Sequence, residues 1–543
     1  MSAPTSPFHS GELKAQRRAG AGDVAAWAGG FIRNFMPDQH RAFYSALPFL
    51  VVAGADAQGR IWTTIIEGDE GFIDSPDRQT LTLATSIDPQ DPLAAAFEAG
   101  SDIGLLGIEL AQRRRNRLSG FIAPRDNGLT IDIRQTFGNC PQYIHEREWR
   151  RVARGQTPNP AITDRLSDEQ ILKIGAADTL FIGTGHSANQ EAASNGFDAS
   201  HRGGEPGFAY VVDPSRIRIP DYAGNNFFNT IGNLLENPRL GLLFIDFETG
   251  SLIQISGHAR VDWEPDIAQD PNARRFIDVT IDAVIERPGA LSLRWAEDTA
   301  PPHQFVVTDK VKEAEGLTSL YLAPSDGNPL HPFQAGQHLP IELEIPGQTA
   351  KVRRTYSLSG LAEAQSYRLT IKRENKGIAS RFLHDELQVG DIINARPPAG
   401  DFTVPDNARP LVLASAGVGL TPILAMLHAA AAENVERPVW FMHGARDSAH
   451  HALRDEVEHA IATRPNIQKH IFYSKPSPQD RQGEDYDAVG RVSADALLSL
   501  NAGPDAHYML CGPVQFLSEV RSGLEAAGVP TDQIHFETFG PTG

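Results

Sequence analysis

The sequence predicts a multidomain protein in which two copies of a β-rich unit precede a third β-rich domain and a final α/β domain with a parallel sheet. Three observations predict this arrangement. The 543 residues are too many for one core and fit three or four domains of roughly 100–200 residues. Residues 1–297 repeat one pattern of glycines and short apolar runs. Residues 408–543 alternate strands with helices, as βαβ units do.

The composition is that of an acidic protein. Lysine and arginine number 49 against 68 acidic residues, a net charge of −19, whereas nucleic acids and anionic membranes reward basic surfaces. Cys140 and Cys511 alone cannot build a disulfide framework, a zinc site or an iron–sulfur cluster. The chain has no apolar run of about 18 residues, and its first residues lack the regions of a signal peptide. We therefore expect a cytoplasmic protein.

The first predicted domain, residues 1–150, begins with a weakly helical segment at 23–35 that we expect to dock on a barrel. Its predicted strands are short apolar runs bounded by Gly, Asp or Pro: 47–52, 61–66, 81–83, 103–110, 118–122 and 129–134. A basic cluster spans residues 113–117. Because side chains alternate along a strand, Arg115 and Arg117 face one side with Arg113, and Arg114 faces the other. The cluster is either a solvated hairpin or a phosphate site.

The same pattern recurs in the second predicted domain, residues 151–297. Gly104 and Gly120 are 16 residues apart, as are Gly241 and Gly257. Three further matches follow the same order: Gly71-Phe72 with Gly207-Phe208, residues 130–133 with 280–283, and Pro141 and Trp149 with Pro288 and Trp295. Four matches in order indicate an internal duplication covering about 45–150 and 178–296.

The two copies differ in their polar residues. The second contains Ser200-His201-Arg202 where the first has residues 64–68 without an arginine. It also contains polar segments at 220–226 and 232–238. If the duplicated unit binds an anion, its donors come from both copies: Ser200, His201, Arg202, Asn225, Asn226 and Asn233 from the second, and Arg115 and Arg117 from the first.

Five segments resemble the pyridoxamine 5′-phosphate oxidase-related split-barrel flavoproteins: residues 8–12, 137–144, 220–226, 232–244, and 288–291 with Trp295. The resemblance implies a duplicated split β-barrel, an internal pseudo-dimer with one or two FMN sites formed by the donors named above. The superfamily also contains haem- and deazaflavin-binding members. A haem-handling module with His201 and His258 as ligands, or a non-catalytic docking module, therefore stays open.

An acidic, proline-containing linker at 297–302 precedes a third β-rich domain, residues 303–405. Arg354-Thr355-Tyr356-Ser357 offers a guanidinium for a pyrophosphate, an aromatic ring and a hydroxyl. A strand containing Thr370 and Lys372 follows. Gly377, Ile378, Ala379 and Ser380 then open a helix expected at 381–387, whose first amides can bind a phosphate.

The last domain, residues 408–543, contains a glycine turn between a strand and a helix. Gly417 and Gly419 let backbone approach a pyrophosphate, and Thr421-Pro422 opens the helix. Cys511-Gly512-Pro513 follows another strand end, and the chain finishes near Glu537 and Phe539. Arg446 and Asp447 follow the strand 439–443, where they leave NADH and NADPH equally possible.

Residues 303–543 as a set resemble the ferredoxin reductase-type module with an antiparallel β-barrel FAD domain and an α/β NAD(P) domain. Their sequence pattern is most similar to that of the reductase half of flavohaemoglobins. The resemblance implies FAD bound at Arg354, Tyr356 and Ser357, with Thr370, Lys372, residues 377–380 and Phe539. It also implies NAD(P)H at the glycine turn, Arg446 and residues 511–513, with Tyr356, Ser357, Cys511 and Glu537 at the reaction centre.

Two features of relatives are missing from the sequence: no globin precedes the module and no ferredoxin-type cysteines follow it. The whole chain is therefore expected to be an oxidoreductase that passes electrons from NAD(P)H through FAD to FMN, and on to a small-molecule substrate or oxygen. The resemblance does not identify that acceptor or the oligomeric state.

Overall fold

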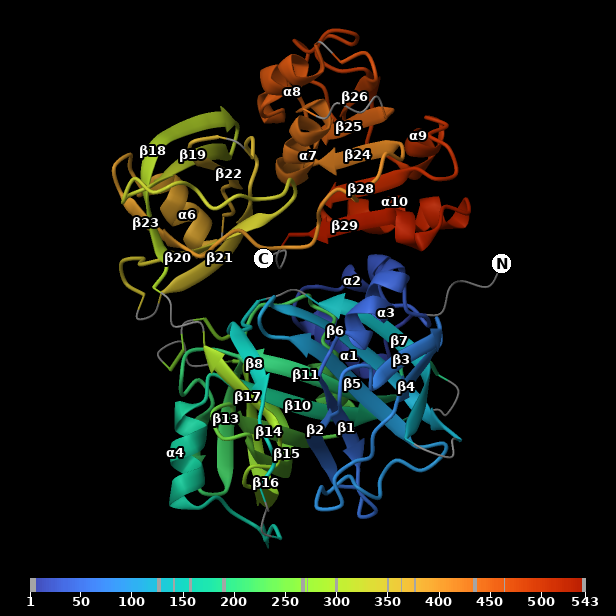
Figure 1. Cartoon of the computed structure of the whole chain (residues 1–543), viewed down its shortest axis with the longest axis vertical. Helices are drawn as coiled ribbons and strands as arrows, with labels where there is room; N and C mark the ends of the chain where they lie inside the picture. The colour runs from blue at the N-terminus through green and yellow to red at the C-terminus, as the bar shows by residue number, and fades with distance from the viewer. Residues whose placement is uncertain are drawn as a thin grey trace. The chain divides into compact units, whose positions relative to one another are not determined.

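The computed structural model divides the chain into two compact units, Met1–Thr299 and Ala300–Phe539 (Figure 1). It describes residues 6–124, 128–139, 142–155, 159–187, 192–264, 269–270, 272–297, 301–348, 351–362, 364–375, 377–432, 437–462 and 464–539. Cys140, Pro141 and the residues after Phe539 lie outside that range. None of the described helices has the length and apolar character needed to cross a membrane.

The first unit contains two antiparallel sheets with the same order of strands. One sheet has the order β2-β1-β5-β6-β7-β4-β3, formed by Phe49–Ala55 (β1), Ile61–Glu67 (β2), Ile73–Asp77 (β3), Thr80–Leu83 (β4), Asp102–Glu109 (β5), Arg114–Ala123 (β6) and Leu129–Asn139 (β7). The other has the order β11-β10-β14-β15-β16-β13-β12, formed by Thr179–His186 (β10), Gly196–Gly203 (β11), Tyr210–Asp213 (β12), Arg216–Asp221 (β13), Arg239–Asp246 (β14), Ser251–Asp262 (β15) and Arg275–Arg287 (β16). A short strand, Ile162–Thr163 (β9), pairs with β16.

The repeated glycines have matching structural roles in the two sheets. The glycines that the sequence pattern aligned, Gly120 of β6 and Gly257 of β15, lie opposite a bulge in the neighbouring strand, where Arg134 of β7 and Asp282 of β16 are the extra residues. A Cβ atom at Gly120 or Gly257 would lie 2.3 Å from a carbonyl oxygen of the neighbouring strand. A bulge that forbids a side chain is a physical reason for both glycines to be there.

One sequence match is wrong by two residues. Residues 130–133 were aligned with 280–283, but the strand registers place Ile133 opposite Gly120 and Ile281 opposite Gly257. Ile133 and Ile281 are therefore equivalent. Because strand side chains alternate with a period of two, a two-residue slip keeps the same faces buried and produces an equally good pattern.

The two sheets pack against each other as a pseudo-symmetric pair. A Cβ atom at Gly241 of β14 would overlap the backbone of Trp62 in β2, and one at Gly104 of β5 would overlap the backbone of Phe197 in β11. Two further strands, Arg147–Arg151 (β8) and Leu293–Glu297 (β17), form a ladder with Trp149 opposite Trp295. Because these residues are equivalent in the two copies, the ladder lies at the pseudo-two-fold axis.

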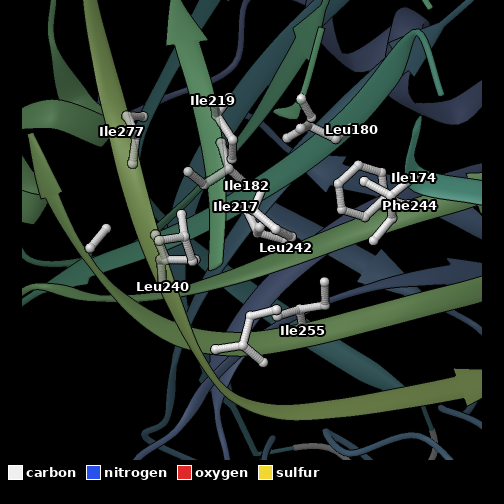
Figure 2. Packing of buried hydrophobic residues seen from close by; sticks show 14 of the residues in the cluster. Ile174, Leu180, Ile182, Ile217, Ile219, Leu240, Leu242, Phe244, Ile255 and Ile277 are labelled. Atoms are coloured by element: carbon white, nitrogen blue, oxygen red, sulfur yellow. The ribbon is translucent and has the colours of Figure 1, made fainter. Parts of the chain in front are cut away.

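Helices complete the first unit: Ser10–Arg18 (α1), Val24–Trp27 (α2), Asp38–Ser45 (α3), Asp168–Ala176 (α4) and Asn229–Glu236 (α5), with a 3₁₀ turn at Ala28–Gly30. The segment 23–35 is thus only partly helical. Helix α1 begins at His9, whose ring accepts from the backbone while Glu12 bonds back to the His9 amide. Aliphatic side chains of the second sheet and of α4 form the core in Figure 2.

The second unit begins with a six-stranded antiparallel sheet of order β21-β20-β23-β18-β19-β22. Its strands are His303–Ala314 (β18), Leu317–Pro324 (β19), His338–Leu343 (β20), Val352–Ser357 (β21), Tyr367–Lys372 (β22) and Ile392–Ala395 (β23). A bridge from Leu358, just after β21, to Leu369 of β22 joins the two edges and closes the sheet into a barrel. Helix Ile378–Asp385 (α6) accompanies the barrel.

The rest of the second unit is a parallel sheet of order β27-β26-β25-β24-β28-β29. Its strands are Leu411–Ala416 (β24), Val439–Ala445 (β25), Ile467–Tyr473 (β26), Ala488–Val489 (β27), His507–Gly512 (β28) and Ile534–Thr538 (β29). The helices are Leu420–Ala432 (α7), Arg454–Ile461 (α8), Ala494–Leu498 (α9) and Val514–Ala526 (α10), with 3₁₀ turns at Gly417–Gly419, Ser448–His450 and Thr531–Gln533. The carboxyl ends of β24, β25 and β28 share one edge, where such sheets bind ligands.

Candidate functional sites

The glycine turn after β24 lies directly against the end of β28. A Cβ atom added at Gly419 would lie 2.2 Å from the carbonyl oxygen of Cys511 and 2.6 Å from the Cα atom of Gly512. Gly417 has a φ of +56° with open space around it. The fold therefore brings together four residues that the sequence assigned to one nucleotide site.

Helix α7 begins at this turn. Thr421 in its first turn is buried, and its Oγ1 atom donates to the Val418 carbonyl oxygen at 3.1 Å. Pro422 is buried beside it, and Pro513 caps the start of α10 from the neighbouring strand end. The first amides of a helix lack intrahelical acceptors and favour negative charge. A small cavity is lined by Gly417 and Thr421 together with Thr370 of the barrel.

Cys511 lies opposite Glu537 in the parallel ladder of β28 and β29. Burial raises the pKa of the Cys511 thiol well above its usual range, and the Glu537 carboxylate adds to this, so the thiol is neutral at neutral pH. Glu537 Oε1 lies 3.8 Å from Nδ1 of His338. Its Oε2 is buried and has no hydrogen-bond partner among the residues described.

His338 links the barrel to this strand end, because it pairs with Ser357 across β20 and β21. A continuous line of contacts thus joins Ser357 through His338 and Glu537 to Cys511 and Gly419. The sequence analysis missed His338. It begins a strand of ordinary alternating pattern, so nothing local in the sequence distinguishes it.

Strand β21 presents the residues predicted to hold the flavin. Arg354 and Tyr356, two residues apart, share one face, and the buried Ser357 is on the other. Arg354 is exposed, and its Nη1 donates to the Arg353 carbonyl oxygen at 2.7 Å. Burial raises the pKa of the half-buried Tyr356 to about 12, so its phenol stays protonated. Phe539 packs against the core of the α/β domain.

Helix α6 begins earlier than the sequence suggested. Ile378, Ala379 and Ser380 form its first turn, and Gly377 is its N-cap without a capping side chain. Ser380 Oγ accepts from the Glu374 amide at 3.1 Å and fixes the turn. The first-turn amides keep their capacity to bind an anion.

Some of the nearby polar side chains are buried and hydrogen-bonded within the protein, whereas others are exposed. Thr370 is buried between the hydroxyls of Ser319 and Ser359, each 2.8 Å away. Lys372 is exposed, with its Nζ atom 2.6 Å from Glu374. At the end of β25, the Arg446 side chain is 59% exposed, whereas Asp447 is hydrogen-bonded to the His450 ring at 2.6 Å.

A second and larger cavity, about 100 Å³, lies in the first unit between the two copies. The first copy contributes Arg115, Arg117, Asn139, Gln142 and Tyr143, and the second contributes His201, Arg202, Gly203, residues 221–226, residues 228–231 and Arg275. Among these described lining residues, four are arginines and one, Asp221, is acidic, so the cavity favours an anion.

The arginines are held in place by neighbouring polar groups. Arg117 donates to Asp198 at 3.3 Å and to the Ser200 hydroxyl. Asp221 lies 3.4 Å from Nη2 of Arg202 and 3.2 Å from Nε of Arg275. The alternation expected of the basic cluster holds for Arg115 and Arg117, which line the cavity, and for Arg114, which lies over the ring of Phe43. It was wrong for Arg113, which precedes β6 with a φ of +56° and lies 3.8 Å from Glu146.

His201 lies on the buried wall of this cavity. Its Nδ1 atom is 3.0 Å from Nη1 of Arg115. Burial, reinforced by that guanidinium, holds the pKa of His201 well below its usual range, so the imidazole is neutral at neutral pH. A neutral ring that accepts at Nδ1 has a proton to donate at Nε2.

Several buried polar atoms of the lining find no hydrogen-bond partner among the residues that the structure describes. They are Nε of Arg117 and Arg202, Nη1 of Arg275, Nδ2 of Asn139, Nε2 of His201 and Oε1 of Gln142. Unsatisfied buried donors are costly in a protein. Five of these six atoms are nitrogens, which fits a ligand rich in acceptor oxygens such as a phosphate.

The remaining predicted residues divide into those near the cavity and those away from it. Asn225 and Asn226 line it, and Ser200 lies directly behind, bonded to Arg117 and Arg202. Asn233 is instead buried between His9 and Thr184. It therefore supports helix α1 rather than the cavity.

His201 and His258 cannot ligate one haem iron together. The strand registers place His201 opposite Phe181, then Leu243, then Gln254, which is four residues from His258. The Cα atoms of the two histidines are thus separated by roughly 13 Å along the strands and roughly 14 Å across them, which is beyond the reach of two imidazoles on one iron. His258 is exposed beside Asp282.

The sequence analysis also missed Tyr143, Asp221 and Arg275 as cavity residues. Tyr143 lies 5.2 Å from the ring of Tyr222, and its hydroxyl donates to the Ala223 carbonyl oxygen. Each comes from a different strand or loop. Tyr143 and Asp221 lie within segments 137–144 and 220–226, which resemble the split-barrel flavoproteins, but nothing local marks these two residues or Arg275 as cavity residues. Only the pairing of the strands brings them together.

Comparisons with known proteins concern the second unit. Residues 308–404 match the oxidoreductase FAD-binding domain family and residues 413–522 match the oxidoreductase NAD-binding domain family. A flavohemoprotein of Pseudomonas aeruginosa is 42% identical over 241 residues, and one of Deinococcus radiodurans is 39% identical over 238 residues. Each match covers 44% of this chain and 59% of the relative, so the chain spans about 59% of the length of these curated relatives.

A solved structure is similar over the same region. The crystal structure of the flavohem-like FAD/NAD-binding domain of nitric oxide dioxygenase from Vibrio cholerae is 33% identical, with a TM-score of 0.40. The match covers 44% of this chain and 100% of that one. The family matches and flavohemoprotein relatives show that the chain contains an NAD(P)H-dependent oxidoreductase module with FAD- and NAD-binding domains of the flavohaemoglobin type.

Proposed function

We propose that the chain is a diflavin oxidoreductase that passes electrons from NAD(P)H through FAD in the second unit to FMN in the first, where a small-molecule substrate or oxygen is reduced. The observation that carries the FMN part is the arginine-lined cavity between the two copies of the first unit. When bound, the flavins supply the redox chemistry, and the protein supplies binding, orientation and electrostatics.

In the barrel, Arg354 binds the pyrophosphate of FAD, and the first turn of α6 at residues 377–380 binds a phosphate through its amides. Tyr356 covers the ring with an uncharged phenol, and Ser357 offers its hydroxyl. The buried Oε2 atom of Glu537, without a partner among the described residues, is a vacant acceptor beside this strand. The residues present therefore fit FAD.

In the α/β domain, Gly417 and Gly419 let the backbone approach the nucleotide pyrophosphate. Cys511, as a neutral and fully buried thiol, offers the nicotinamide an uncharged, dry contact. Arg446 reaches the adenosine side from the end of β25.

In the first unit we assign the duplicated sheets to a tandem split barrel. The identical strand order and the pseudo-two-fold ladder support this assignment. Arg117, Arg202 and Ser200 then hold the FMN phosphate, and Arg275 completes the positive wall. The proposed domains are residues 1–150, 151–297, 303–405 and 408–543.

The direct test is to denature the purified full chain and identify the released flavins chromatographically. We expect FAD and FMN together. Arg354→Ala should lose FAD, whereas Lys351→Ala, an exposed residue at the start of the same strand, should keep it. Arg202→Ala should lose FMN, whereas Arg216→Ala, an exposed arginine of β13, should keep it. FAD without FMN in the native protein would refute the relay.

A further inference from the structure

The strand registers allow the cavity of the first unit to be compared with its pseudo-symmetric counterpart. Gly104 and Gly241 occupy equivalent positions in the two copies. Starting from this pair, the strand pairings identify the equivalent of every other residue. Arg117 lies opposite Leu106 and Gln254 opposite the equivalent Leu243, so Arg117 and Gln254 are equivalent. The same reading makes Ser200 equivalent to Thr64, Asn139 to Arg287, Arg202 to Ile66, and Arg115 to Leu252.

The three polar counterparts converge on one carboxylate, that of Asp91. Thr64 Oγ1 donates to Asp91 Oδ2, Arg287 Nη1 lies 2.6 Å from the same oxygen, and Gln254 Nε2 lies 3.3 Å from it. The Asp91 side chain is 1% exposed. An internal carboxyl group is therefore held by the equivalents of Ser200, Asn139 and Arg117. Burial raises its pKa, while Arg287 and the hydrogen bonds from Thr64 and Gln254 favour the carboxylate.

Asp91 belongs to the segment of the first copy that corresponds to the segment lining the open cavity in the second copy. Residues 84–101 connect β4 to β5, as residues 222–238 connect β13 to β14 in the other copy. In the first copy this segment turns inward, and Leu93 is fully buried against Trp62 and Ile285. In the second copy, Tyr222 to Asn226 line the open cavity instead.

The remaining donors of the open cavity have apolar counterparts. Ile66 stands in place of Arg202 and Leu252 in place of Arg115, and both are buried. The counterpart site thus keeps a polar floor, formed by Thr64 of the first copy with Gln254 and Arg287 of the second, and Asp91 fills it. It lacks the arginines that would attract a charged ligand from solvent.

We propose that the pseudo-symmetric counterpart of the cavity is an anion site permanently occupied by the Asp91 carboxylate, so that the first unit binds one phosphate-bearing ligand per chain rather than two. The identification of that ligand as FMN rests on the proposed function, whereas the occupied site does not. A carboxylate and a phosphate accept hydrogen bonds from the same donors, and Asp91 therefore also indicates where the phosphate lies in the open cavity: between Arg117, Ser200 and Asn139.

The occupied site is tested by removing the carboxylate. Asp91→Ala leaves the buried Arg287 without its closest anion and should lower the melting temperature of the full chain strongly. Formate, a carboxylate small enough for the vacated space, should restore several degrees saturably, compared with chloride at equal ionic strength. Wild-type protein and Asp91→Asn, whose amide fills the space, should show no such formate effect. Asp91→Ser provides a second opened variant if Asp91→Ala does not fold.

A formate effect in neither opened variant overturns the occupied anion site. The stoichiometry is measured separately by titrating flavin-stripped native chain with FMN. One FMN per chain is expected, and two per chain would overturn the proposal. No FMN binding together with formate rescue would refute the proposed function and leave the occupied site standing.

Discussion

Replacing Gly419 by alanine should disable nucleotide binding while leaving the flavin of the barrel in place. The new Cβ atom would lie 2.2 Å from the Cys511 carbonyl oxygen, against about 3.4 Å for an ordinary contact, and the obstacle is backbone rather than a flexible side chain. The turn must therefore move by about 1 Å. A displacement of that size in a binding site costs roughly 100-fold, which we expect in KM for NAD(P)H.

Gly528→Ala, just after the C-terminal end of α10, is the matched control in the same domain, away from the nucleotide turn. Its Cβ atom would meet nothing within 4 Å, and its φ of +90° adds only backbone strain, about 1 kcal/mol of stability, so KM should stay close to that of the wild type. The assay is steady-state reduction of ferricyanide by NAD(P)H, with FAD content measured on the same samples. Equal KM values for the two variants, or a Gly419→Ala enzyme within about fivefold of wild type, would refute the assignment of this turn.

Three further predictions concern single groups. Burial raises the pKa of Glu12 from 4.5 to about 8, so the folded state binds its proton more tightly and stability falls as the pH rises from 4.5 to 8, by at most about 5 kcal/mol. Glu12→Gln should remove that fall in urea titrations at pH 5 and pH 8, and an unchanged pH dependence would contradict the burial argument. Arg446→Ala should raise KM for NADPH more than for NADH, because Asp447 is already bonded to His450, and equal effects would argue against a role at the 2′-phosphate. Cys511 should resist iodoacetamide at pH 8 in the folded protein, as judged by peptide mass spectrometry, since its thiol is buried and protonated, and rapid labelling would exclude the uncharged contact proposed for it.

The sequence was enough to predict a feature where backbone geometry permits only one residue type. Gly120 and Gly257 mark bulges, and Gly419 marks a backbone contact, so each left a signal that does not depend on distant residues. The alternation of strands and helices in residues 408–543 was likewise sufficient for the parallel sheet, because its strands are continuous apolar runs. Helix boundaries were less certain, as α6 shows by starting three residues early.

The sequence alone did not predict which residue each polar side chain contacts. His338 meets Glu537 from nearly 200 positions away, and Arg275 meets Asp221 from another strand. Helix α1 depends on His9 packing against His186 and Asn233, contacts that no local periodicity encodes. These residues became visible only once the order of the strands was known.

The asymmetry of the first unit follows from its being one chain. In a homodimer both copies of an isologous site must have the same residues, so a mutation that closes one site closes both. Tandem duplication removes that constraint, because Asp91 and Arg202 belong to different copies of the same fold. Filling one site with a buried carboxylate stabilises the interface between the sheets through Arg287, Thr64 and Gln254. The other site is then free to keep an arginine-rich opening between the two copies, whose unsatisfied donors are costly without a ligand.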